Sequence, residues 1–132
     1  MKILYLTYDG LSDPLGQSQV IPYIIGLSKR GHQIVVLSSE KKAPEALLNT
    51  IRKQMDEHRI EWHSITYTKN PPVLSTIYDV LRMTFRSIRL NKVHRFRIVH
   101  CRSYITSLIG YYLHRSRAIR FIFDMRGFYA DE

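Results

Sequence analysis

The chain has 132 residues, a length that suits one compact domain, and its 45% hydrophobic and 23% charged residues are close to the averages of soluble globular proteins. These values exclude a disordered chain, and a single cysteine, Cys101, excludes both an internal disulfide framework and a cysteine metal cluster. The 20 Lys and Arg against 11 Asp and Glu give a formal charge of +9, which favours anionic partners such as nucleic acid, a membrane surface or a phosphate-bearing ligand.

The first part of the chain predicts a strand, a polar loop and a helix. The apolar run over residues 2–8 ends at a turn signal, which predicts a strand buried on both faces. A loop rich in Asp, Gly, Ser and Pro follows, and apolar residues then recur at helical spacing. Because the first turn of a helix tolerates proline, Pro22 places the start of this helix near residues 17–19, and Gly31 ends it.

The remainder of the chain continues to alternate strands with helices. Further strands are predicted over residues 33–39, 60–67, 97–101 and 118–124, and further helices over residues 44–58, 74–95 and 104–115. The partial alternation of strand 60–67 is typical of a sheet edge. No tight hairpin signal separates the strands, so the crossovers are right-handed and the sheet is parallel. We therefore predict one α/β domain over residues 1–132: a Rossmann-like, doubly wound parallel sheet of about five strands in the order 3-2-1-4-5, with helices on both faces.

Targeting signals are not evident in the sequence. No segment is apolar over the roughly 18 residues that a spanning helix needs, and the amino terminus lacks the charged lead, apolar run and cleavage site of a signal peptide. We therefore expect a cytoplasmic protein.

The predicted topology also predicts where a ligand binds. In an open parallel sheet, ligands bind beyond the carboxyl ends of the strands, at the point where the strand order reverses. Here the reversal lies between strands 2–8 and 97–101, so the loops after these two strands and after strand 118–124 are expected to meet. The candidate site residues on these loops are Asp9, Gly16, Gln17, His100, Arg102, Asp124 and Arg126.

Most of these residues also have a purely structural interpretation. Gly16 precedes a helix amino terminus, where free N–H groups bind an anion or a hydroxyl-rich ligand, or it is a plain turn glycine. Asp9 either orients sugar hydroxyls or caps the helix. His100 acts as a general base or only satisfies local hydrogen bonds, whereas Arg102 is suited to a phosphate.

The remaining signals at these loops are weaker. Asp124 and Arg126 either contact a ligand or pair with each other across the last loop. The sequence contains neither the G-x-G-x-x-G fingerprint of dinucleotide-binding folds nor a Walker phosphate loop. No group of His, Cys or carboxylate residues has the spacing of metal ligands, so no metal site is predicted.

The predicted helix 74–95 is amphipathic and basic. A sector about 100° wide holds its large apolar side chains, and we expect this sector to pack on the sheet. The adjoining flank holds Arg82, Arg86 and Arg89. These arginines either are solvated or face an anionic membrane, where each contributes on the order of 1 kcal/mol. The apolar sector consists of Leu74, Ile77, Tyr78, Leu81, Phe85 and Ile88.

The motifs at these loops together resemble a known family. They are the polar loop with Gly16 before a helix, Gly31-His32 followed by the strand residues QIVV, the segment IVHCRSY over residues 98–104, and FIFDMRGFYADE over residues 121–132. In this order and spacing, the sequence resembles the amino-terminal domain of retaining GT-B glycosyltransferases, specifically glycosyltransferase family 4. The segment DMRG, residues 124–127, resembles the subgroup that acts in surface polysaccharide assembly.

The resemblance implies an acceptor-side domain of an enzyme that moves a sugar from a nucleotide-sugar to a polysaccharide or lipid-linked acceptor. It implies that His100 is the active-site histidine and that the loop at Gly16 lies near the donor phosphates or the acceptor. In this loop, Leu15-Gly16 replaces the usual pair of glycines.

The resemblance also has implications for the whole enzyme. The parent protein would be a hexosyltransferase-type enzyme with a second, donor-binding domain that carries a pair of glutamates. The fragment 1–132 ends before such a domain and is expected to be inactive alone. The nucleotide-sugar is the only co-substrate expected, with no metal or other cofactor, and a lipid-linked acceptor would place the enzyme at the inner face of the membrane.

Two other classes of function remain open. One is a non-catalytic, flavodoxin-like module that binds a small ligand or has a regulatory role. The other is nucleic-acid binding, which the charge suggests, but the sequence contains no recognised nucleic-acid-binding signature. We therefore expect no nucleic-acid partner.

Overall fold

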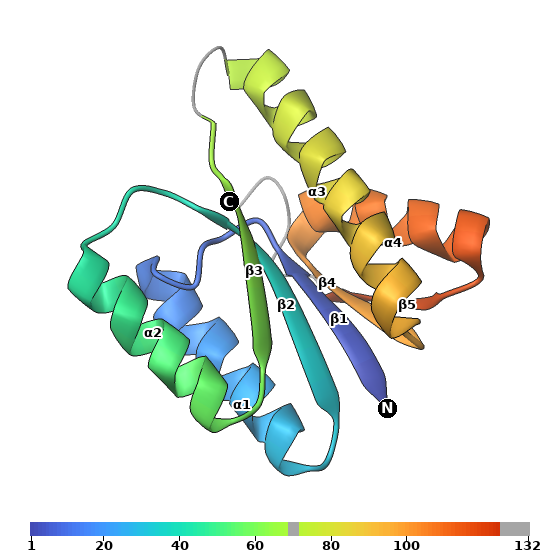
Figure 1. The fold of residues 1–132 in the computed structure, drawn as a ribbon. Coiled ribbons are helices and arrows are strands. Elements are labelled where there is room, and N and C mark those ends of the chain that lie inside the picture. Colours follow the sequence, from blue (N-terminus) through green and yellow to red (C-terminus); the bar gives the residue numbers. More distant parts are fainter. Residues whose placement is uncertain (69–71, 125–132) are drawn as a thin grey trace.

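The computed structural model describes residues 1–68 and 72–124, and these residues form a five-stranded parallel sheet (Figure 1). The strand order is β3-β2-β1-β4-β5, so the predicted doubly wound α/β fold and the edge position of the third strand are confirmed. The strands are β1 Lys2–Thr7, β2 Gln33–Glu40, β3 Glu61–Thr66, β4 Ile98–Arg102 and β5 Arg120–Asp124.

The helices form a layer on each side of this sheet (Figure 1). α1 and α2 pack on one face against the side chains of Tyr5 and Val36, and α3 and α4 pack on the other against those of Leu6 and Leu37. Side chains alternate across a strand, and helices cover both faces of the sheet, so the central strands are buried on both sides. This burial explains their continuous apolar runs. The helices are α1 Ile21–Lys29, α2 Glu45–Glu57, α3 Pro72–His94 and α4 Ser103–Arg117.

The first helix begins earlier than the sequence predicts. A π-helical turn, η1 (Gly16–Val20), precedes α1, and the helical backbone extends back to residue 14. In this turn the N–H of Ile21 donates to the carbonyl of Gly16, five residues earlier, and Pro22 is in the first turn of α1 proper. The prediction was wrong because a wider π turn accommodates a proline that an uninterrupted α-helix would not. The predicted stop is confirmed, since Gly31 has φ 92° and the N–H of His32 donates to the carbonyl of Leu27.

The orientation of α3 contradicts the prediction that its apolar sector packs on the sheet. Five of the sector's six residues, Leu74, Ile77, Tyr78, Leu81 and Phe85, are exposed, and Ile88 alone of the six is partly buried and packs against the core. The side that faces the sheet is instead formed by Ser75, Asp79, Met83, Ser87 and Leu90.

Hydrogen bonds of one buried carboxylate account for this orientation. Asp79 accepts bonds from the Tyr8 hydroxyl, at 3.0 Å, and from the N–H of Thr68, at 2.9 Å. These bonds fix the amino-terminal half of α3 against the chain just beyond β1 and β3. Burial and the neighbouring Asp79 also raise the pKa of Tyr8, so its hydroxyl remains a donor.

The polar loop after β1 is organised by Glu40, the last residue of β2. Its carboxylate accepts hydrogen bonds from the N–H of Leu11, at 2.7 Å, and from the hydroxyl of Ser12, at 2.7 Å. Within the loop, the Asp13 carboxylate accepts a bond from the N–H of Gly10 at 3.0 Å. The carboxylates of Glu40 and Asp13 therefore hold the loop in one shape, because they accept hydrogen bonds from backbone N–H groups of the loop.

Gly16 is required by the close packing of this loop. A Cβ atom at this position would lie 2.0 Å from the carbonyl oxygen of Gly10, far inside any allowed contact. We expect Gly16→Ala to lower the free energy of unfolding by about 1–3 kcal/mol or more, since backbone atoms have to move. Thermal or urea unfolding followed by circular dichroism measures the change.

Gly26→Ala is the matched control. Gly26 lies in α1, where a Cβ atom would meet no other atom within 4 Å, so the substitution should stabilise the domain by about 0.5–1 kcal/mol. Equal stability of both variants would contradict the packing role of Gly16.

A second close approach joins α4 to β4. The Cys101 thiol is buried, and burial raises its pKa to about 12. Gly110 of α4 lies directly over it, because a Cβ atom on Gly110 would be 2.3 Å from Sγ of Cys101.

We expect the Cys101 thiol to resist Ellman's reagent in the native protein and to react only after unfolding. The thiolate is the reactive form, and both burial and the raised pKa suppress it. Gly110→Ala should accelerate labelling, because α4 must move away from β4. Rapid labelling of the native wild-type protein would contradict this packing.

Candidate functional site

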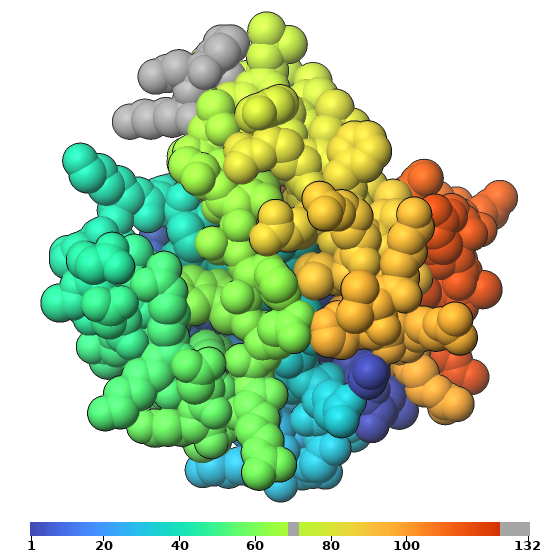
Figure 2. All heavy atoms as spheres, in the orientation of Figure 1, coloured from blue at the N-terminus to red at the C-terminus, as the bar shows by residue number. Residues whose placement is uncertain are grey.

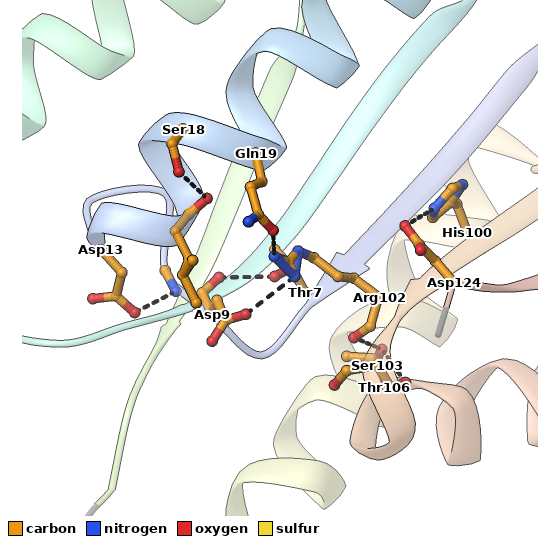
Figure 3. Close-up of polar contacts among 12 residues, drawn as sticks. Thr7, Asp9, Asp13, Ser18, Gln19, His100, Arg102, Ser103, Thr106 and Asp124 are labelled. Atoms are coloured by element: carbon orange, nitrogen blue, oxygen red, sulfur yellow. Dashed lines mark hydrogen bonds and ion pairs between the residues drawn. The ribbon is translucent and has the colours of Figure 1, made fainter. Parts of the chain in front are cut away.

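The candidate site lies at the carboxyl ends of β1, β4 and β5, where the strand order reverses (Figure 3). In the register of the sheet, Tyr5 is opposite His100, and Arg102 lies between Thr7 and Asp124. His100 and Arg102 are two residues apart on β4, so their side chains lie on the same face of the sheet, the face that α1 covers.

The guanidinium of Arg102 is the buried charge of this site. Its side chain is only 2% exposed, and it donates to the Asp9 carboxylate at 3.3 Å and to the side-chain oxygen of Gln19 at 2.5 Å. Arg102 thereby joins β4 to the loop after β1 and to η1, as Figure 3 shows. Its Nε–H is buried and has no hydrogen-bond partner among the described residues.

An unpartnered buried donor is unfavourable, so this N–H is suited to an acceptor that a ligand brings. A phosphate or sugar oxygen provides such an acceptor. Asp9 is partly exposed, so its carboxylate remains within reach of a ligand in solvent.

His100 forms a second cluster on the same face. The residue is 5% exposed, and its ring stacks on that of Tyr5 with centroids 4.7 Å apart. The centroid of the Tyr23 ring lies 5.3 Å from that of the His100 ring. Nε2 of His100 is 3.0 Å from the carboxylate of Asp124.

This arrangement fixes both the orientation and the tautomer of the ring. An ionised carboxylate only accepts hydrogen bonds, so Nε2 carries the proton and Nδ1 is the basic nitrogen. A histidine oriented by a carboxylate in this way is able to bind a hydroxyl or take its proton.

The structure brings together four of the predicted site residues, Asp9, His100, Arg102 and Asp124. Gly16 is in the adjoining loop but packs against the backbone of Gly10. Gln17 points elsewhere, with its amide donating to the carbonyl of Ser12 on the exposed side of the loop. Arg126 lies outside the described residues.

Several contributing residues were not predicted from sequence. Gln19 of η1, which was not among the predicted site residues, binds Arg102. Tyr5 and Tyr23 surround His100, and Glu40 holds the loop. The only sequence signal for Tyr5 is its place in a buried strand next to β4.

A hollow of about 470 Å³ lies at the opposite, amino edge of the sheet. It is lined by Lys2, His32 and His94, and by Glu61, whose pKa is lowered mainly by its hydrogen bond to His63. Among residues 1–68 and 72–124, no group of three or more His, Cys, Asp or Glu side chains is arranged to hold a metal ion. The described helices also include none that is long and apolar enough to cross a membrane.

No protein-family model matches this sequence, and no curated protein sequence matches it. Solved structures do match its fold. The calicheamicin glycosyltransferase CalG4 matches with a TM-score of 0.69 at 12% identity, over 96% of this chain and 32% of that chain. A glycosyltransferase from Rickettsia africae matches with a TM-score of 0.61 at 17% identity, over 97% of this chain and 30% of that chain.

A domain of a different protein matches equally well. The carboxyl-terminal domain of a hydrogenase from Pyrococcus furiosus has a TM-score of 0.67 at 12% identity, over 94% of this chain and 90% of that domain. At such identities the likeness shows the fold alone. The chain spans about a third of the two glycosyltransferases, and the resemblance to GT-B glycosyltransferases is supported at the level of this fold.

Proposed function

We propose that this chain is the acceptor-side domain of a glycosyltransferase that moves a sugar from a nucleotide-sugar to a polysaccharide or lipid-linked acceptor. The observation that carries the proposal is the buried Arg102, with an unpartnered Nε–H, beside the paired His100 and Asp124 at the reversal of strand order. This site combines a cation for a phosphate with a histidine for a hydroxyl, the two groups that such substrates present.

Each residue has a defined role in this proposal. Arg102 binds a phosphate oxygen of the substrate, and its contacts with Asp9 and Gln19 hold the guanidinium in place. Nδ1 of His100 accepts a hydrogen bond or a proton from a sugar hydroxyl, while Asp124 stabilises the protonated ring. Asp9 and the loop at Gly16 lie where sugar hydroxyls approach.

The proposal divides the enzyme into two halves. The nucleotide-sugar is a co-substrate held mainly by a separate donor-binding domain, and no metal or other cofactor takes part. Membership of family 4 and a role in surface polysaccharide assembly, at the inner face of the membrane, belong to the same proposal. They are supported by the segments IVHCRSY and FIFDMRGFYADE.

A non-catalytic ligand-binding module is the second candidate. It is favoured by the match to nearly the whole of a hydrogenase domain, which shows that this fold also occurs outside glycosyltransferases. Such a module would bind its ligand at the same edge without turnover.

We expect His100→Ala in the full-length natural protein to lower the rate of sugar transfer by about 10²–10⁴-fold, because a positioned proton acceptor contributes this much. Arg102→Lys should mainly raise the KM for the phosphate-bearing substrate, because lysine keeps the charge but loses the planar fork. The assay follows labelled sugar from a panel of nucleotide-sugars into lipid-linked acceptors.

His114→Ala is the control, since His114 is exposed on α4, on the other side of the sheet. Circular dichroism verifies that each variant is folded. Unchanged transfer by His100→Ala would contradict the proposed role. Turnover by residues 1–132 alone would contradict the separate donor half, and ligand binding without transfer by the full-length protein would favour the non-catalytic module.

A further inference from the structure

The outward face of α3 carries a row of exposed large hydrophobic side chains. Phe85 is 67% exposed and Leu74 65%, and Ile77, Tyr78 and Leu81 are each more than half exposed. Figure 2 shows the side chains of α3, in yellow, forming the surface of the molecule with no other element over them. We call the five residues Leu74, Ile77, Tyr78, Leu81 and Phe85 the outer row.

The outer row lies opposite the side that faces the sheet. The sheet side of α3 holds three buried polar residues, Ser75, Asp79 and Ser87, beside the apolar Met83 and Leu90, whereas the five side chains of the outer row point away from the core. Folding of the domain therefore leaves the five outer-row side chains in water, where their apolar surface contributes little to stability. A contiguous exposed apolar surface of this kind marks an interaction site.

The charge around the outer row is entirely positive. Along α3 the only acidic residue is Asp79, which is buried, and α4 has none. The basic residues of the two helices are Arg82, Arg86, Arg89, Lys92, Arg115 and Arg117. By contrast, α2 on the other side of the sheet carries Glu45, Asp56 and Glu57 beside Arg52 and Lys53.

The arginines of α3 do not all serve the same purpose. Arg82 is engaged within the protein, because it donates to the carbonyl of Thr66 at 3.1 Å and lies 3.6 Å from the carboxylate of Asp79. Arg86 and Arg89 are exposed and form no ion pair with any described residue. Together with Lys92, which is also exposed and has no ion pair with a described residue, they are the cations of α3 that are available to a partner.

We propose that α3 docks on an anionic lipid bilayer, with the outer row inserted among the acyl chains and Arg86 and Arg89 at the lipid phosphates. An amphipathic helix with large apolar residues and flanking arginines binds a membrane interface in this orientation. A second copy of this chain is a poorer occupant, because a symmetric contact would bring arginines together with no exposed carboxylate on α3 or α4 to neutralise them. The proposal rests on exposure and charge and is independent of the proposed transfer reaction.

The test is co-sedimentation with vesicles of equal parts phosphatidylglycerol and phosphatidylcholine, compared with vesicles of phosphatidylcholine alone. We expect the wild-type protein to bind the anionic vesicles more tightly. Leu81→Ser with Phe85→Ser should lower the partition coefficient by about tenfold or more, because two exposed apolar side chains no longer leave water. Arg86→Gln and Arg89→Gln should each lower it by about fivefold.

Two matched controls separate the outer row from general effects. Lys53→Gln removes one charge from α2, as each arginine variant does from α3, and Leu15→Ser removes an exposed apolar side chain from the segment after β1. Both should bind vesicles more tightly than the corresponding α3 variants. All of these positions are exposed or lie in surface helices, and circular dichroism verifies the fold of each variant.

Insertion has a separate spectroscopic signature. With Trp62→Phe as the background, Phe85→Trp should show a blue-shifted emission on anionic vesicles and quenching by brominated acyl chains. Failure of the wild-type protein to bind anionic vesicles would overturn the proposal. So would a loss of self-association in Leu81→Ser with Phe85→Ser at unchanged vesicle binding, since the outer row would then be a contact between copies.

Discussion

The pairing of β1 with β4 is the contact on which the candidate site depends. These strands are far apart in sequence, and their parallel pairing places Tyr5 opposite His100 and Thr7 opposite Arg102. It also creates the reversal of strand order, because β2 and β3 extend the sheet on one side of β1 while β4 and β5 extend it on the other. The loops after β1 and β4 diverge there to opposite faces, which opens the edge of the sheet to a ligand.

In both clusters at this edge, a carboxylate from a neighbouring strand or loop binds a basic side chain of β4. Arg102 is held by Asp9 from the loop after β1, and His100 by Asp124 from β5. Each carboxylate reduces the cost of burying a charged or proton-binding group, and each also orients it. The strands of the sheet thus position His100, Arg102 and Asp124. The hydrogen bonds of Glu40 to the loop after β1 keep Asp9 and Gln19 within contact distance of Arg102.

Sequence patterns predicted the fold and which strand ends meet at the reversal of strand order, because both follow from the order of the elements. Apolar runs and helical spacing identified the elements, and the alternation of strands and helices determined the topology, so the meeting of the loops that carry Asp9 and Arg102 followed. Sequence could not predict the π turn that carries Gln19 to Arg102, because the turn depends on how Pro22 is accommodated. It also misplaced the apolar sector of α3. Helical periodicity identifies two faces, but the hydrogen bonds of Asp79 with Tyr8 and Thr68 decide which face is buried, and these join segments distant in sequence.

The same bonds of Asp79 relate α3 to the candidate site. They connect α3 to Tyr8 and Thr68, which follow β1 and β3 directly, so the amino-terminal half of the helix lies near the carboxyl edge of the sheet (Figure 1). Arg82 reinforces this placement through the carbonyl of Thr66, the last residue of β3. Most of the outer row belongs to that half of α3, whereas His100 and Arg102 lie near the same edge on the other face of the sheet. Under the two proposals together, a bilayer bound to the outer row would lie near the edge that carries the candidate site, and a lipid-linked acceptor would have to extend around the carboxyl ends of β1 and β4 to reach Arg102.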